Sequence, residues 1–162
     1  MYLPEINFLT SNNLPEILRL NASEVSWSEA VIRADLQENS NNEITYLGAF
    51  ATTPEAPLLG YAVLSREKRI GILMAVIVDK IYRRRGIATQ LLLAVGDCAG
   101  YLNMKRLRLR VRKSNFGAIA LYSKLSFTGE DVKRGYYSNG EDAIVMSAAL
   151  PLKLKSAGEA FA

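Results

Sequence analysis

The chain has 162 residues, 49% hydrophobic and 22% charged, a composition typical of one soluble globular domain rather than a disordered segment. With no histidine and one cysteine, it cannot build histidine-dependent triads, His-ligated metal sites, an internal disulfide or a cysteine-only zinc site. The net charge of +4 suits an acidic or phosphate-bearing ligand or a ribosomal environment, and is equally common as a solubility feature. Without a long apolar run or a secretory-signal pattern, we expect a cytoplasmic protein that makes no membrane contact.

Capping patterns in the first part of the chain predict a strand and two helices. The predicted elements are a strand over 5–9, a helix over 11–23 with Pro15 in its first turn, a helix opened by a capping box over Ser26–Glu29 and ending near Gln37, and a polar loop over 38–43.

Three strands are predicted next, over 44–52, 58–67 and 70–79. The first two flank a proline-punctuated turn, as in a hairpin. The third is an almost unbroken apolar run, which is typical of a central strand covered on both faces.

The C-terminal half alternates between helical and strand periodicity. Residues 87–102 repeat apolar side chains at helical spacing, at Ile87, Leu91, Leu92, Val95 and Ala99. Residues 105–113 alternate strictly, so Leu107, Leu109 and Val111 should face opposite to Arg106, Arg108, Arg110 and Arg112. A short helix capped by Ser114 or Asn115 and two strands around 138–141 follow.

The predicted order is therefore βααβββαβαββ, an α/β (α+β) domain with a mixed, mostly antiparallel central sheet flanked by helices. We place this single domain at residues 1–150. A C-terminal tail over 151–162, which we expect to fray, would follow it.

The turn after the third of these strands has the chemistry of an anion site. The backbone amides of the loop and of the helix beginning near Gly86 can cradle a phosphate, and Gly86 and Ala88 keep the approach open. Arg83, Arg84 and Arg85 add positive charge. The alternative is a solvated basic loop before an ordinary helix.

Two motifs together resemble the GNAT superfamily of N-acetyltransferases. The first is Arg-x-x-Gly-x-Ala at Arg83, Gly86 and Ala88, and the second is Ser-Asn-x-x-Ala-Ile-x-Leu-Tyr from Ser114 to Tyr122. The resemblance extends over nearly all of residues 5–150. It is closest to the bacterial ribosomal-protein-alanine N-acetyltransferases, whose early Pro-Trp-Ser-Glu and closing strands are similar to residues 26–29 and 134–146.

The resemblance implies acetyl-CoA as donor, no metal, and a primary amine as acceptor, most like a protein N-terminus such as that of a ribosomal protein. It assigns Tyr122 as the general acid and places an acceptor groove at Trp27, Tyr136 and Tyr137. The residues that it implies for cofactor binding are Val76, Ile77 and Val78 along the pantetheine arm, Arg84, Arg85, Gly86, Ile87, Ala88 and Thr89 at the pyrophosphate, and Asn115 at the pantetheine end. A tyrosine on an apolar helix face could instead simply pack in the core.

The chain departs from the family pattern at two positions. Arg110 stands where the subfamily carries its general-base glutamate, and a guanidinium cannot be a base. Ser126 replaces the glycine usual after the last helix, where a left-handed conformation is expected. The missing carboxylate favours an α-amine, which is partly neutral at pH 7, over lysine.

Three functional hypotheses remain open from the sequence. The first is acetylation of a protein N-terminus. The second is acetylation of a small acidic metabolite or antibiotic, motivated by Arg110. The third is a CoA-binding or RNA-binding module without catalysis, motivated by the missing glutamate and the arginine row over 106–112. Such a row is more commonly a solvated sheet face, and direct nucleic-acid binding is not our expectation.

Overall fold

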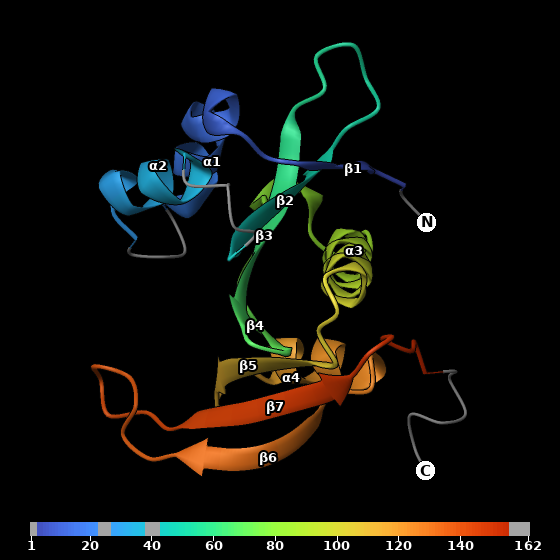
Figure 1. Ribbon diagram of the computed structural model, residues 1–162. Coiled ribbons are helices and arrows are strands. Elements are labelled where there is room, and N and C mark those ends of the chain that lie inside the picture. The colour runs from blue at the N-terminus through green and yellow to red at the C-terminus, as the bar shows by residue number, and fades with distance from the viewer. Residues whose placement is uncertain (1–2, 23–26, 38–42, 156–162) are drawn as a thin grey trace. The chain divides into compact units, whose positions relative to one another are not determined.

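The computed structural model describes residues 3–22, 27–37 and 43–155, and the predicted order of elements is confirmed within them (Figure 1). Two short 3-10 segments, Ser11–Asn13 and Lys80–Tyr82, accompany the main elements. The strands are β1 (Glu5–Phe8), β2 (Ile44–Phe50), β3 (Leu58–Glu67), β4 (Ile70–Val78), β5 (Arg106–Arg112), β6 (Thr128–Lys133) and β7 (Ala143–Ala149). The α-helices are α1 (Leu14–Asn21), α2 (Glu29–Gln37), α3 (Ile87–Tyr101) and α4 (Phe116–Lys124).

The strands follow one another in the hydrogen-bonded order β1-β2-β3-β4-β5-β7-β6. The β1–β2, β2–β3, β5–β7 and β6–β7 pairs are antiparallel, whereas β4 and β5 are parallel neighbours over residues 70–72 and 106–108. The predicted mixed α/β architecture is therefore confirmed. Within this fold the chain forms two compact units, a first one of Met1–Glu67 and Leu73–Val95 and a second one of Lys68–Ile72 and Gly96–Ala162.

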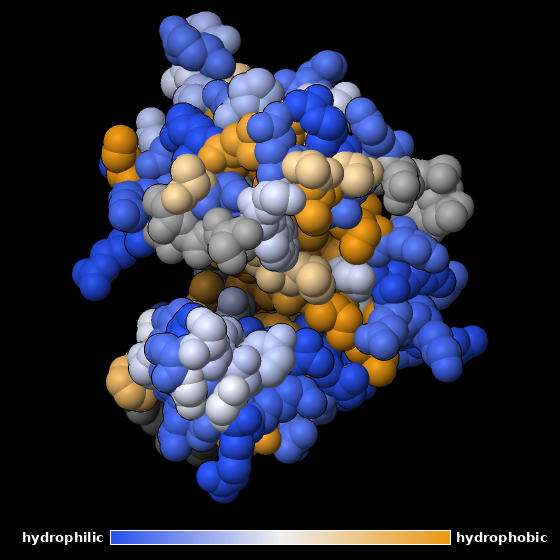
Figure 2. Space-filling model, turned by 90° about the vertical axis from the view of Figure 1, so that its left-hand side faces the viewer, coloured by the Kyte–Doolittle hydropathy of each residue, from blue (hydrophilic) through white to orange (hydrophobic). Residues whose placement is uncertain are grey.

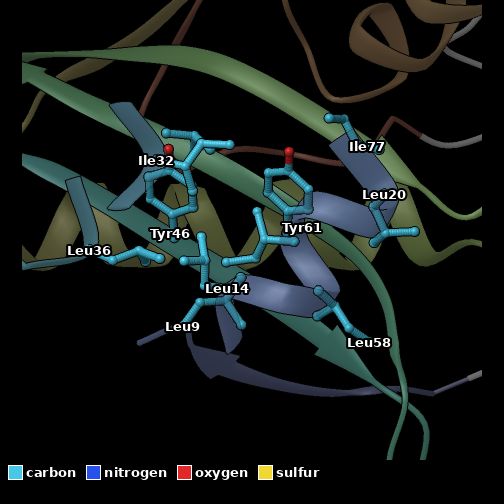
Figure 3. Packing of buried hydrophobic residues seen from close by; sticks show 11 residues of the cluster. Leu9, Leu14, Leu20, Ile32, Leu36, Tyr46, Leu58, Tyr61 and Ile77 are labelled. Carbon is cyan, nitrogen blue, oxygen red and sulfur yellow. The ribbon is translucent and has the colours of Figure 1, made fainter. Parts of the chain in front are cut away.

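The core of the first unit packs α1 and α2 against β2 and β3 (Figure 3). Tyr46 and Tyr61 stack at its centre, with ring centroids 6.1 Å apart and planes 10° from parallel. The Tyr46 hydroxyl donates to Asp35 at 2.8 Å, which ties α2 to β2. The apolar faces of the two helices thus pack into a common core.

The second helix starts differently from the predicted capping box. Ser28 supplies the cap, because its Oγ accepts from the Val31 N–H at 3.3 Å and α2 begins at Glu29. Ser26, the predicted cap, lies outside the described residues, as do residues 38–42 of the predicted polar loop. The capping box is found instead at Thr10 and Asn13, ahead of α1.

The alternation predicted for the arginine-rich strand is confirmed in the second unit, where β5, β7 and β6 lie side by side (Figure 1). Leu107, Leu109 and Val111 are buried, while the arginines between them reach the opposite face. The five apolar residues predicted for the core face of α3 are buried too. No α-helix in the described part of the chain is long and apolar enough to span a bilayer.

Two expectations from the sequence were wrong in detail. Strand β4 is not covered on both faces throughout, since the Met74 side chain is 47% exposed. The tail is not frayed from residue 151 onward, because the Lys155 N–H donates to the Lys124 carbonyl at 2.7 Å and the Leu152 side chain lies against Gly96. Residues 156–162 lie outside the described residues.

Ser126 accounts for part of this anchoring. Its φ of +71° is the left-handed conformation that the family pattern predicted at this position. Its hydroxyl donates to the Lys153 carbonyl at 2.8 Å. This hydrogen bond offsets the conformational cost of a non-glycine residue in the left-handed region.

Candidate functional site

In the first unit, strand β4 ends in a tight turn that is built around Asp79. One carboxylate oxygen accepts from the Ile81 N–H at 3.1 Å, and the Asp79 carbonyl accepts from Tyr82 at 2.9 Å. Arg83 then reaches back, and its Nε donates to the Val78 carbonyl at 3.2 Å. These contacts reverse the chain so that the loop leads into the start of α3.

Arg84 and Gly86 give this loop its shape. Both residues adopt a left-handed backbone conformation, with φ of +63° for Arg84 and +80° for Gly86. Left-handed residues in a loop can turn neighbouring backbone N–H groups toward one side, which is how anion-binding loops are built. A Cβ built on Gly86 would meet no atom within 4 Å, so the space in front of this backbone is open.

The first turn of α3 completes an anion cradle. The Gln90 N–H donates to the Gly86 carbonyl at 3.1 Å as the helix begins, which leaves Ile87, Ala88 and Thr89 with N–H groups that have no acceptor inside the helix. The positive end of the helix dipole lies at the same place. Arg85 is stacked on the Tyr82 ring at 5.3 Å and adds a cation. The site therefore fits a phosphate or pyrophosphate group.

Arg19 of α1 is a contributor that sequence reasoning missed. Its guanidinium donates to the Asp79 carboxylate at 2.9 Å and to the Leu58 carbonyl at 3.1 Å, and Asp79 is 60 residues away along the chain. Burial alone would raise the pKa of Asp79, but the hydrogen bond and charge of Arg19 hold it below its usual value. A cavity of about 130 Å³ beside this pair is lined by Arg19, Leu20, Ile77, Val78, Asp79 and Lys80.

The predicted pantetheine-binding segment runs along the end of β4. A Cβ on Gly60 of β3 would come 2.6 Å from the Ile77 carbonyl oxygen, so glycine is required for this close backbone approach. The Ile77 side chain is buried in the core of the first unit, whereas Val76 and Val78 are half-buried. Trp27, predicted to bind the acceptor, packs partly against the same core.

In the second unit, α4 carries the predicted general acid. The Tyr122 ring lies tilted against Phe127, with centroids 5.7 Å apart. Burial, with a smaller contribution from the nearby Tyr137, raises the pKa of the Tyr122 hydroxyl to about 12. Asn115 caps the same helix, since its Oδ1 accepts from Ala118 N–H at 3.2 Å. This cap uses the oxygen of Asn115 and not its Nδ2 donor.

Arginine and tyrosine side chains are interleaved next to this helix. The guanidinium of Arg112 lies 3.9 Å over the Tyr137 ring, and that of Arg110 lies 5.4 Å from the centre of the Tyr136 ring. The two tyrosine rings meet edge to face at 5.1 Å. This cluster holds the loop between β6 and β7 beside β5, and Figure 2 shows that loop as a surface of hydrophilic and intermediate hydropathy.

Carboxylates near this cluster are engaged by the protein. Glu141 accepts from the Ser114 N–H at 3.1 Å and from Arg112 at 3.3 Å, and these contacts lower its pKa, with the Ser114 hydrogen bond the largest cause. Asp142 accepts from the Gly135 N–H at 2.9 Å. Both are thereby poor candidates to replace the missing glutamate base.

The predicted site residues thus form two sets. The loop and strand residues from Val76 to Thr89 gather in the first unit, and Arg110, Asn115, Tyr122, Tyr136 and Tyr137 lie in the second. No cluster of three or more histidine, cysteine or acidic side chains that could hold a metal occurs in the described ranges.

Comparison with known proteins agrees with these observations. Residues 14–127 match the model of the acetyltransferase (GNAT) family. The chain is 31% identical to the [ribosomal protein bS18]-alanine N-acetyltransferase of Escherichia coli K12, over 92% of this chain and 98% of that protein. It is 45% identical to an N-alpha-acetyltransferase of Saccharolobus solfataricus, over 51% of this chain and 50% of that protein. The crystal structure of the ribosomal-protein-S18-alanine N-acetyltransferase from Escherichia coli superposes with a TM-score of 0.79, at 24% identity, covering 96% of this chain and 97% of that one.

Proposed function

Because the chain belongs to the acetyltransferase (GNAT) family and is an N-acetyltransferase, we propose that it transfers the acetyl group of acetyl-CoA to the N-terminal α-amine of a protein. The observation that carries this choice is Arg110, which stands beside Tyr136 where a base is expected. An acceptor that needs little help in losing its proton suits such a site. Two relatives whose names specify α-amine or alanine acetylation point the same way.

The loop before α3 is proposed to hold the pyrophosphate of the cofactor. The open space at Gly86 and the backbone amides from Arg84 to Thr89 fit two phosphate groups. The backbone of Val76, Ile77 and Val78 would hydrogen-bond the pantetheine arm, with Asn115 offering its Nδ2 group at the other end. When bound, acetyl-CoA supplies an activated thioester. The backbone N–H groups of β4 would stabilise negative charge that develops on its carbonyl oxygen.

Tyr122 is proposed as the general acid. With a pKa of about 12 its hydroxyl is fully protonated at neutral pH, as an acid must be before it acts. Complete transfer to a thiolate of ordinary pKa, about 8.5, would cost about 5 kcal/mol. Tyr122 therefore first stabilises the leaving sulfur by donating a hydrogen bond to it. The proton of the Tyr122 hydroxyl passes to the sulfur only as the thiol forms.

The acceptor amine is proposed to lose its proton without a protein carboxylate. Deprotonation at pH 7 costs about 1 kcal/mol for an α-amine and about 4.6 kcal/mol for a lysine. The guanidinium of Arg110 repels an ammonium and so favours the neutral amine. The lower intrinsic pKa selects α-amines over lysine side chains, because the repulsion by Arg110 acts on both kinds of amine.

The acceptor is proposed to lie against Trp27, Tyr136 and Tyr137. A ribosomal protein N-terminus in the cytoplasm is a suitable substrate, and a membrane is not required. RNA binding by the arginine row is disfavoured, because three of its four guanidiniums already contact Ser147, Glu130 and Glu141. We also propose that the catalytic domain ends near residue 150.

Two matched peptides test this function. One has a free N-terminus and no lysine, and the other has a blocked N-terminus and one internal lysine. Thiol release from acetyl-CoA should be fast with the first and at background with the second, and mass spectrometry should place the acetyl group on the first residue. Acetylation of the lysine peptide alone, or of neither peptide, would overturn the proposal.

A further inference from the structure

The four arginines on the exposed face of β5 are not equivalent. Arg106 donates to the Ser147 hydroxyl at 2.8 Å, and Arg108 forms an ion pair with Glu130 at 2.6 Å. Arg112 pairs with Glu141 at 3.3 Å. For Arg110, no carboxylate among the described residues is a partner. Its contacts are aromatic, over the Tyr136 ring and 3.5 Å from the Tyr136 hydroxyl.

An aromatic ring orients a guanidinium without neutralising it. The ring face attracts the cation, but it carries no net charge. The Tyr136 ring is itself held edge to face by Tyr137, which Arg112 covers on one face. Arg110 is thus a fixed, exposed and uncompensated positive charge, whose N–H groups suit bidentate pairing with a carboxylate.

This charge lies at the predicted reaction site. The Tyr137 ring meets edge to face the Tyr136 ring on which Arg110 lies. Burial and then the nearby Tyr137 raise the pKa of Tyr122, while burial raises the pKa of Tyr137 and the charge of Arg110 acts in the opposite direction. Arg110 and the proposed acid Tyr122 are therefore neighbours of one side chain. A group paired with Arg110 would lie close to an amine presented to Tyr122.

We infer that Arg110 selects acceptor N-termini that carry an aspartate or glutamate among their first two residues. This inference rests on the proposed function and names its substrate class. The acceptor carboxylate would supply Arg110 with the kind of partner that Glu130 and Glu141 provide to Arg108 and Arg112. The same pairing would offset the tendency of an acidic side chain to keep the neighbouring α-amine protonated.

The test uses four peptide acceptors of otherwise identical sequence. Two begin with Asp-Ala or Asn-Ala, and two with Ala-Asp or Ala-Asn, so that each pair differs in charge and hardly in shape. The readout is kcat/KM from thiol release, at low and at high salt. Wild-type protein should prefer the acidic peptide of at least one pair by on the order of tenfold, mainly through KM, and salt should weaken that preference.

Two variants of equal charge change assign the effect to one residue. Arg110→Gln should abolish the preference, measured as the ratio of kcat/KM between the acidic and the amide peptide of each pair with the same variant. Arg106→Gln, four residues away on the same strand face, should leave it intact. Equal rates on acidic and amide peptides with wild-type protein, or a preference that persists in Arg110→Gln, would overturn the inference. Failure to acetylate any of the four peptides would instead count against the proposed function.

Discussion

Replacing Gly86 probes the proposed cofactor site and the stability of its loop separately. The residue has φ of +80°, a conformation that costs an L-residue about 1–2 kcal/mol. Since no atom lies within 4 Å of the position of a new Cβ, no clash adds to this cost. For a protein of this size, Gly86→Ala should lower Tm by about 2–8 °C. Gly100→Ala, on α3 with similar free space and no left-handed φ, should not lower it.

The effect on CoA binding should be larger and should depend on charge. A carboxylate about 4 Å from a phosphate charge is repelled by about 4 kcal/mol at an effective dielectric constant of 20. Gly86→Glu should therefore weaken CoA binding by on the order of 1,000-fold, and Gly86→Gln by much less. Calorimetric titration with CoA, on variants shown to be folded by circular dichroism, measures both. Wild-type affinity in folded Gly86→Glu would refute the placement of the pyrophosphate on this loop.

Three further predictions concern the second unit. Tyr122→Phe should lower kcat by roughly 10²–10⁴ with CoA affinity nearly unchanged, and a steady-state kcat within threefold of wild type would make this tyrosine a packing residue only. The wild-type pH profile of kcat/KM on a peptide should rise with unit slope up to the acceptor pKa of about 8, and Arg110→Glu should flatten it; a wild-type plateau beginning near pH 6 would reveal a protein base. Ser126→Ala should keep the strained backbone and lose the hydrogen bond to Lys153, so denaturant titration should show an unfolding free energy lower by about 1 kcal/mol. Ser126→Gly should be close to neutral, because relief of the backbone strain offsets the loss of the same hydrogen bond.

Local pattern in the sequence was enough to predict every strand and helix in order, and the reason is physical. Strand alternation in β5 and the helical repeat of α3 are set by which side chains avoid water, and the structure buries the residues so predicted. Caps are equally local, as at Asn115, because they satisfy amides within three or four residues. The left-handed backbone at Ser126 was expected from the resemblance to the family, whereas that at Gly86 was not predicted.

The partners of charged side chains could be known only from the tertiary structure. Arg19 meets Asp79, and Arg108 meets Glu130, across separations of 60 and 22 residues that carry no periodic signal. In the sequence pattern of β5 the four arginines are equivalent. The strand order β5-β7-β6 and its register place Ser147, Glu130 and Glu141 beside three of them, whereas Arg110 contacts the Tyr136 ring. The sequence therefore determined where the cation stands, and strand pairing determined that it stays uncompensated, because ion pairs between distant segments depend on which strands become neighbours.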